Sequence, residues 1–70
     1  MTELWGADSC PSCRQALTLL QRAHIEFRYV DVAKIAFEGE IPRVILGNGT
    51  QIIGLGPINN YIKQQLREMI

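Results

Sequence analysis

The chain has 70 residues, of which 47% are hydrophobic, and its seven basic and seven acidic residues give a net charge of zero. This balance argues against partners such as nucleic acid or a membrane surface, which bind through basic patches. The sequence shows no signal peptide and no apolar run approaching the roughly 18 residues of a membrane span, so we expect a cytoplasmic protein with one domain, residues 1–70.

The first half of the chain predicts a strand, a helix and a second strand. The first strand covers residues 4–6, and the helix begins at Pro11, whose missing N–H costs nothing at the first helical position. Apolar residues recur on one face of this helix; they are Cys13, Ala16, Leu17, Leu20 and Ala23. Residues 26–32 alternate polar and apolar side chains and are rich in aromatic and β-branched types, which predicts the second strand.

The middle of the chain predicts a short helix followed by a hairpin. Residues 33–38 have room for about one and a half helical turns. Residues 43–46 and 50–53 are strand-like, and the Asn48-Gly49 pair between them favours a two-residue hairpin, because both positions tolerate positive φ.

The last predicted element is a helix that Pro57 opens after a glycine-containing break at residues 54–56. Its apolar stripe consists of Ile58, Tyr61, Ile62, Leu66 and Met69. The resulting order, β-α-β-(short α)-β-β-α, predicts an α/β fold with a four-stranded mixed sheet and helices on both of its faces.

The only two cysteines lie two residues apart, in Cys10-Pro11-Ser12-Cys13. In a reducing compartment such a pair is more often catalytic or metal-binding than structural. Cys10 comes immediately before the predicted helix, so its sulfur faces the free N–H groups and the positive end of the helix dipole, which favours a reactive thiolate. Cys13 lies one turn inward, within reach and less exposed. We therefore expect Cys10 to attack a disulfide and Cys13 to resolve the mixed disulfide.

Other interpretations of the two cysteines are weaker. A structural disulfide across so short a loop stabilises little. A zinc site needs four ligands, and the remaining candidate, His24, lies at the far end of the helix, so no metal site is expected within one chain. A cluster shared between two chains remains an alternative. So does a scaffold that binds partners along Ile41-Pro42.

Three motifs in this order resemble the glutaredoxins: Cys-Pro-Ser-Cys after the first strand, Ile41-Pro42 before the third, and the glycine-containing break before the last helix. The resemblance covers essentially the whole chain and is greatest to the compact bacterial and virus-encoded types. It implies a thioredoxin-like fold. Cys10 is then the nucleophile, Cys13 the resolving thiol, Pro11 and Ser12 support them, and Pro42 is a cis-proline facing them.

The same resemblance implies a substrate-binding set and a reaction. Ile41, through its backbone, together with Gly54 and Leu55, would bind a substrate or glutathione. Arg43, directly after Pro42, is interpreted equally well as a residue that binds a substrate carboxylate and as a solvated charge at the strand edge. The implied activity is the reduction of protein disulfides or glutathione mixed disulfides by a monomer. Ribonucleotide reductase is one implied protein substrate, and glutathione is a co-substrate rather than a tightly bound cofactor.

Ala7 stands where many glutaredoxins carry a glutathione-binding lysine, so two electron donors stay open, glutathione and a flavoprotein of the thioredoxin-reductase type. The alternative function within this resemblance is an iron–sulfur cluster carrier that uses Cys10 and glutathione in a dimer. Trp5 and Tyr29 are expected to be packing residues, and His24 an ordinary helix-end residue.

Overall fold

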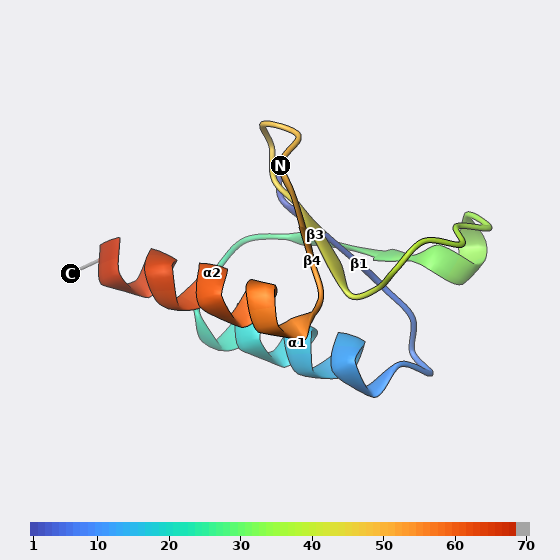
Figure 1. Ribbon diagram of the computed structural model, residues 1–70, viewed down its shortest axis with the longest axis horizontal. Helices are drawn as coiled ribbons and strands as arrows, with labels where there is room; N and C mark the ends of the chain where they lie inside the picture. The colour runs from blue at the N-terminus through green and yellow to red at the C-terminus, as the bar shows by residue number, and fades with distance from the viewer. Residues whose placement is uncertain (69–70) are drawn as a thin grey trace.

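A computed structural model describes residues 1–68; Met69, a predicted member of the last apolar stripe, lies outside this range. Four strands form one mixed sheet in the order β2-β1-β3-β4 (Figure 1). The strands are β1 (Glu3–Gly6), β2 (Arg28–Asp31), β3 (Arg43–Ile45) and β4 (Gln51–Ile53). β1 runs parallel to β2 and antiparallel to β3, and β3 runs antiparallel to β4. The predicted four-stranded mixed sheet is therefore confirmed, with a second strand shorter than expected.

Two helices, α1 (Pro11–Arg22) and α2 (Leu55–Glu68), lie next to each other and cover one face of the sheet (Figure 1). Their buried side chains meet those of β1 and β3 in a single core, which consists of Leu4, Ala16, Leu20, Ala23, Val44, Ile58 and Ile62. This burial of alternate strand residues against helices is the main source of stability in a chain of this size.

The prediction of helices on both faces is wrong. Between β2 and β3 the chain forms only a single 3-10 turn, η1 (Val32–Lys34), in place of the expected helix over residues 33–38. Asp31 caps this turn by accepting a hydrogen bond from the N–H of Ala33 at 3.0 Å. Ala36 then takes a φ of +54°, outside the right-handed helical region, so the turn cannot be extended.

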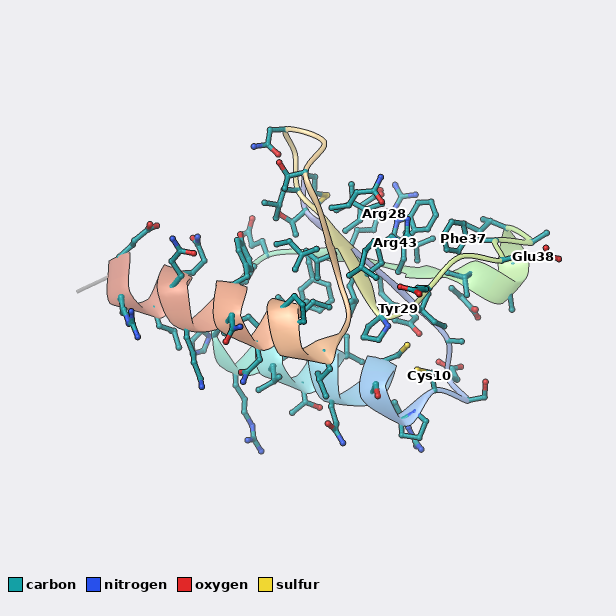
Figure 2. All side chains as sticks on the ribbon, in the orientation of Figure 1. Cys10, Arg28, Tyr29, Phe37, Glu38 and Arg43 are labelled. Atoms are coloured by element: carbon teal, nitrogen blue, oxygen red, sulfur yellow. The ribbon has the colours of Figure 1, made fainter. Side chains whose placement is uncertain are left out.

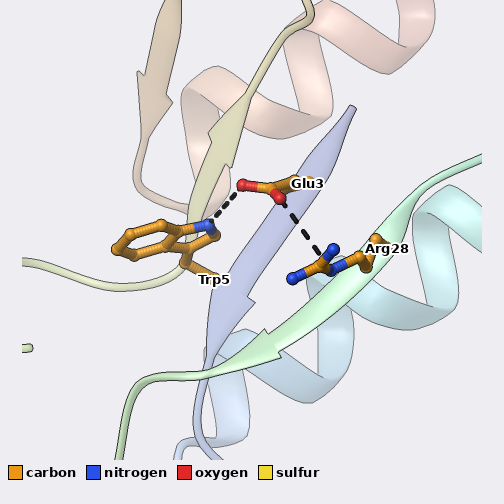
Figure 3. Close-up of polar contacts among 3 residues, drawn as sticks. All are labelled: Glu3, Trp5 and Arg28. Atoms are coloured by element: carbon orange, nitrogen blue, oxygen red, sulfur yellow. Dashed lines mark hydrogen bonds and ion pairs between the residues drawn. The ribbon is translucent and has the colours of Figure 1, made fainter. Parts of the chain in front are cut away.

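The segment after η1 covers the sheet face that is turned away from the helices. Phe37 meets Trp5 of β1 edge to face, with ring centroids 5.0 Å apart, and the Arg43 guanidinium lies 4.9 Å from the centre of the Phe37 ring. Beside them, Glu3 accepts a hydrogen bond from Nε1 of Trp5 at 3.0 Å and lies 3.9 Å from Nε of Arg28 (Figure 3). A few aromatic and polar contacts thus cover this face in place of a helix.

α1 ends in a left-handed residue that is not a glycine. His24 has a φ of +56°, and its N–H donates to the carbonyl of Gln21 at 3.1 Å, while the N–H of Ile25 donates to the carbonyl of Leu20 at 3.2 Å. These two bonds form a Schellman motif, which satisfies carbonyls at the helix end. His24 is therefore a helix-end residue, as predicted.

The β3–β4 hairpin has three loop residues, 47–49, rather than the predicted two. The N–H of Gly49 donates to the carbonyl of Leu46 at 2.9 Å, and the N–H of Leu46 donates to the carbonyl of Thr50 at 2.8 Å. Gly49 alone has a positive φ in this loop, +91°. Asn48 instead accepts a hydrogen bond from the N–H of Thr50 through its side chain. A turn followed by a left-handed glycine is a common three-residue hairpin.

α2 begins at Leu55, two residues before the proline that was expected to open it. Gly54, with a φ of +98°, precedes the helix, and its carbonyl accepts the N–H of Ile58 at 3.1 Å. Pro57 falls within the first turn, where N–H groups lack helical partners in any case. The buried stripe is narrower than predicted, because Leu66 is 43% exposed. None of the helices in the described part of the chain is long and apolar enough to cross a membrane.

Candidate active site

Cys10 caps the N-terminus of α1. Its backbone is extended, and its Sγ accepts a hydrogen bond from the N–H of Cys13 at 3.3 Å. Its own N–H donates to the carbonyl of Ala7 at 3.1 Å, and its carbonyl accepts the N–H of Arg14 at 3.2 Å. The sulfur thus occupies the position of the side-chain oxygen that caps most helices. The Sγ therefore lies at the positive end of the α1 dipole, the position that the sequence predicts for it.

Cys13 lies behind Cys10, in the interior. Its exposed fraction is 1%, whereas Cys10 is half-buried. The two cysteines are 2.7 Å apart and both are free, so the pair is described in its reduced form. Cys10 is therefore the more accessible residue of the pair.

The pKa of the Cys13 thiol is raised from an ordinary 9.0 to about 11. Burial is the largest cause, because it disfavours the charged form. The hydrogen bond to Cys10 and the charge of Cys10 raise this pKa further, and a backbone hydrogen bond from Ala7 lowers it. In the reduced pair, Cys13 is accordingly a protonated thiol at neutral pH.

Gly6, at the end of β1, makes room for Cys13. A Cβ at this position would lie 2.9 Å from the Cβ of Cys13 and 3.1 Å from its Sγ, both shorter than ordinary contacts. Gly6 is not among the site residues predicted from the sequence. The available signal was its place at the end of the strand that leads into the cysteine loop.

The Ile41–Pro42 peptide bond is cis, as the resemblance implies, and Pro42 is buried. The carbonyl of Pro42 accepts the N–H of Gly54, one of the predicted binding residues, at 2.8 Å. Leu55, the next predicted binding residue, packs against the core. The backbone of Ile41 makes no backbone hydrogen bond within residues 1–68, so its N–H and C=O are available to a bound chain.

The strand register places Pro42 beside Gly6, on which Cys13 packs. Trp5 is paired with Arg43, so the next positions of these two antiparallel strands, Gly6 and Pro42, lie opposite each other at the same end of the sheet. Leu4 and Val44, two residues further from this end, both face the helices. Alternation along a strand therefore turns Pro42 to the helix side as well, the side of the cysteines.

Tyr29 is the second residue that the sequence analysis did not assign to the site. It is paired with Leu4 and therefore faces the helices, on the same side as Cys10 (Figure 2). A Cβ placed at Gly6 would lie 3.6 Å from the hydroxyl oxygen of Tyr29 and 3.1 Å from the Sγ of Cys13. Only the parallel register of β1 and β2 brings it there, and a pattern along the sequence gives no signal for it.

The pKa of Tyr29 is raised above its ordinary 10.0. Burial is the largest cause, followed by the negative charges of Asp8 and Asp31, and then by those of Cys13 and Cys10. These causes place the hydroxyl among the acidic groups around the cysteine pair and keep it protonated at neutral pH.

Arg43 lies on the other side of the sheet from the cysteines (Figure 2). Its Nη1 donates to Oε1 of Gln51 at 2.7 Å, its Nε donates to the carbonyl of Glu40 at 3.2 Å, and it covers the Phe37 ring. The Arg43 side chain therefore does not point toward Cys10. It is also not entirely solvated, because it contacts Gln51, Glu40 and Phe37. Its described contacts are structural.

The remaining predicted residues lie at the start of α1. Pro11 occupies the first helical position, as predicted, and is exposed, while Ser12 is half-buried behind it. Within the described residues no group of three or more His, Cys, Asp and Glu side chains is arranged to hold a metal ion.

Two solved structures resemble this arrangement. A glutathione S-transferase from Xanthobacter autotrophicus Py2 matches with a TM-score of 0.75 and 19% identity over 91% of the chain, and the chain spans 37% of that transferase. A glutaredoxin from Archaeoglobus fulgidus matches with a TM-score of 0.72 and 20% identity over 94% of the chain and 85% of its own length. No protein-family model and no curated protein matches the sequence. Both structures are thioredoxin-fold proteins, so the fold is thioredoxin-like, as predicted.

Proposed function

We propose that this thioredoxin-fold chain is a dithiol thiol–disulfide oxidoreductase that reduces protein disulfides or glutathione mixed disulfides. One observation carries the proposal: the sulfur of Cys10 accepts a helix N-terminal N–H at 3.3 Å, with the free, buried Cys13 directly behind it. A half-buried thiol in this position is suited to attack, and a buried thiol one turn away is suited to resolve. The two similar structures, a glutaredoxin and a glutathione S-transferase, support thiol chemistry on this fold.

In the first step the Cys10 thiolate attacks one sulfur of a substrate disulfide. The S–S bond of the substrate breaks, a new S–S bond to Cys10 forms, and the departing thiolate takes a proton from solvent. The helix N-terminus stabilises the charge of the attacking sulfur before the reaction.

In the second step Cys13 loses its proton to solvent and attacks the sulfur of Cys10. The Cys10–Cys13 disulfide forms, and the second substrate sulfur leaves as a thiolate that is then protonated. Two of the causes that raise the Cys13 pKa originate in Cys10. Once Cys10 is bound in a mixed disulfide its charge is gone, so the pKa of Cys13 falls when the thiolate is needed.

The backbone of Ile41 and the buried Pro42 offer the substrate a docking edge. An extended substrate segment would pair with the N–H and C=O of Ile41, like an added strand. Gly54 supports this edge through its hydrogen bond to the Pro42 carbonyl at 2.8 Å. Pro11 and Ser12 would support the cysteines from the first turn of α1, as the resemblance implies.

Repeated turnover requires a source of electrons for the Cys10–Cys13 disulfide. The oxidised pair returns to the dithiol by reaction with glutathione, a co-substrate, or with a flavoprotein reductase. Ribonucleotide reductase is among the proposed protein substrates, and the chain would act in the cytoplasm as a monomer with one domain, residues 1–70.

Single-cysteine variants test the proposal. Cys10→Ser should abolish the reduction of both an insulin disulfide and a glutathionylated cysteine peptide. Cys13→Ser should accumulate a mixed disulfide with insulin, while glutathione still turns over the glutathionylated peptide through Cys10 alone. Wild-type turnover in Cys10→Ser would contradict the proposal, and a coloured, cluster-containing dimer without turnover would favour the iron–sulfur alternative.

A further inference from the structure

The hydroxyl of Tyr29 shares one small space with the sulfur of Cys13. Both flank the position above Gly6 where a Cβ would stand, the hydroxyl oxygen at 3.6 Å and the sulfur at 3.1 Å. The two groups come from β2 and α1, and the absence of a side chain at Gly6 leaves no atom of β1 between them. The register of Tyr29 with Leu4 fixes the phenol on this face of the sheet.

This hydroxyl is available as a donor. It makes no hydrogen bond to another group in residues 1–68. Its raised pKa keeps the proton on the oxygen at the pH where the second step runs. A tyrosine hydroxyl in a half-buried position usually has a polar partner, and the sulfur of Cys13 borders the same space at Gly6.

Cys13 needs such a donor in the second step. The N–H at the helix N-terminus that could serve a sulfur is directed at Cys10. The backbone of Ala7 supplies a favourable hydrogen bond to Cys13. The carboxylates whose charge acts on the Tyr29 hydroxyl are Asp8, from the loop before α1, and Asp31, at the end of β2. Neither of them can donate a hydrogen bond to a thiolate when ionised. Tyr29 brings a hydroxyl that can donate a hydrogen bond to the space beside Cys13.

We propose that the Tyr29 hydroxyl donates a hydrogen bond to the Cys13 thiolate while Cys13 attacks the mixed disulfide at Cys10. This inference rests on the proposed function and assigns Tyr29 to its second step alone. In that step the Cys13 proton goes to solvent, the Cys13–Cys10 bond forms, and the bond between Cys10 and the substrate sulfur breaks. The substrate leaves as a thiolate, which takes a proton from solvent. The Tyr29 proton stays on the phenol throughout. Reactions that need only Cys10 do not involve Tyr29.

The test compares Tyr29→Phe with Tyr61→Phe, which removes a hydroxyl from another half-buried tyrosine packed against the core. Rapid mixing with a glutathionylated cysteine peptide separates the two steps. The first is formation of the mixed disulfide at Cys10, and the second is release of the thiol that was bound to Cys10. In Tyr29→Phe the release step should slow about tenfold or more, the typical effect of removing a hydrogen bond to a charged group. The pH midpoint of the release rate should move upward, because Cys13 holds its proton more tightly when no hydroxyl donates to its thiolate. Tyr61→Phe should leave both unchanged.

A second arm excludes a merely structural effect. In the Cys13→Ser background, adding Tyr29→Phe should leave the rate of mixed-disulfide formation at Cys10 unchanged. If Tyr29→Phe destabilises the fold, 3-fluorotyrosine can be incorporated into the Tyr61→Phe protein, where position 29 is the remaining tyrosine. This residue keeps the ring and its packing but has a more acidic phenol. The pH midpoint of the release step should then move downward. A release step with the wild-type rate and midpoint in Tyr29→Phe would overturn this inference alone. A wild-type protein that forms no mixed disulfide at Cys10 would overturn the proposed function as well.

Discussion

The two faces of the sheet are built in opposite ways. On the helix side, Leu4 and Val44 are fully buried against α1 and α2, and at the end of the same face Cys13 packs on Gly6. On the other side, Trp5 and its neighbours are covered by the segment that holds Phe37. The helix side therefore combines the core with the candidate site, and the chemistry of a buried thiol depends on the same packing that stabilises the fold.

This difference shows how a short chain can lose a helix without losing the site. A chain of this length has a free energy of unfolding of only about 4–10 kcal/mol. Replacing a helix by a 3-10 turn on the outer face removes packing that the cysteines do not contact. The same loss on the helix side would expose Cys13.

The largest expected effect contrasts a core residue on the helix side with an apolar residue on the outer face. Leu4→Ala should lower the free energy of unfolding by about 2–5 kcal/mol, because it leaves a cavity in a fully buried position. Ile53→Ala, at a residue that is 38% exposed, should cost about 1 kcal/mol or less. Urea unfolding followed by circular dichroism measures both. Equal losses would break the comparison between the faces.

The second prediction concerns the pH dependence that the helix side gives the reduced protein. The folded-state pKa of Cys13 is about 11 against an ordinary 9.0. Its protonated form therefore contributes stability below pH 9, and this contribution is lost as the pH rises from 9 to 11. The loss should amount to about 2–3 kcal/mol. It is measured by urea unfolding in the presence of a reductant across this range.

Two variants separate the causes of this pH dependence. Cys13→Ala should remove the loss that begins at pH 9, whereas the raised pKa of Tyr29 contributes a loss of the same sign that begins only above pH 10. Cys10→Ser should reduce the loss that begins at pH 9 without removing it, because burial, the largest cause, remains. A reduced Cys13→Ala protein that still loses the same stability between pH 9 and 11 would assign the loss to another group.

The third prediction addresses the contact between β1 and Cys13. Gly6→Ala places a Cβ 2.9 Å from the Cβ of Cys13, so the thiol must move, at a cost of about 1–3 kcal/mol and with a slower second step. Gly56→Ala is the matched control. A Cβ there meets no atom within 4 Å, and alanine at this helical position should stabilise the fold by up to about 1 kcal/mol. Thermal unfolding and disulfide-exchange kinetics of both variants test the contrast, and a neutral Gly6→Ala would contradict it.

Gly6 and Tyr29 also mark the limit of what the sequence predicts. The cysteine pair, its place before a helix and the order of the elements follow from local patterns, since Pro11 opens a helix and the aromatic and β-branched residues of 26–32 indicate a strand. The contact between Tyr29 and the space around Cys13 depends on the register between two strands that lie far apart in the chain. No residue type or spacing encodes that register by itself.

The missing second helix has a different cause. The composition of residues 33–38 permits a helix, but Asp31 caps a single turn and Ala36 takes a left-handed conformation. Arg43 was likewise ambiguous in the sequence. Its position directly after Pro42 suggested a substrate contact, whereas the alternation of β3 turns it to the outer face.

The fourth prediction concerns Phe37, which covers Trp5 on the outer face of the sheet. Phe37→Ala deletes the edge-to-face contact with Trp5 and the contact with the Arg43 guanidinium. The expected loss is about 1–2 kcal/mol, from typical values for an aromatic pair and an exposed cation–π contact. The reaction rates at Cys10 should stay unchanged, because these residues lie on the other side of the sheet. A slowed disulfide exchange in Phe37→Ala would show that the two faces are coupled.

The smallest effect is expected for the ion pair of the outer face. Glu3 and Arg28 approach only to 3.9 Å, and the Arg28 side chain is 68% exposed, so solvent screens their attraction. A double-mutant cycle with Glu3→Gln and Arg28→Gln should give a coupling energy below about 0.5 kcal/mol that shrinks further in high salt. Glutamine at position 3 keeps an oxygen that can accept the hydrogen bond from Trp5, so the cycle isolates the charge. A coupling above 1 kcal/mol would mean that the outer face is held far more firmly than its exposure implies, and the contrast between the two faces would then rest on the cysteines alone.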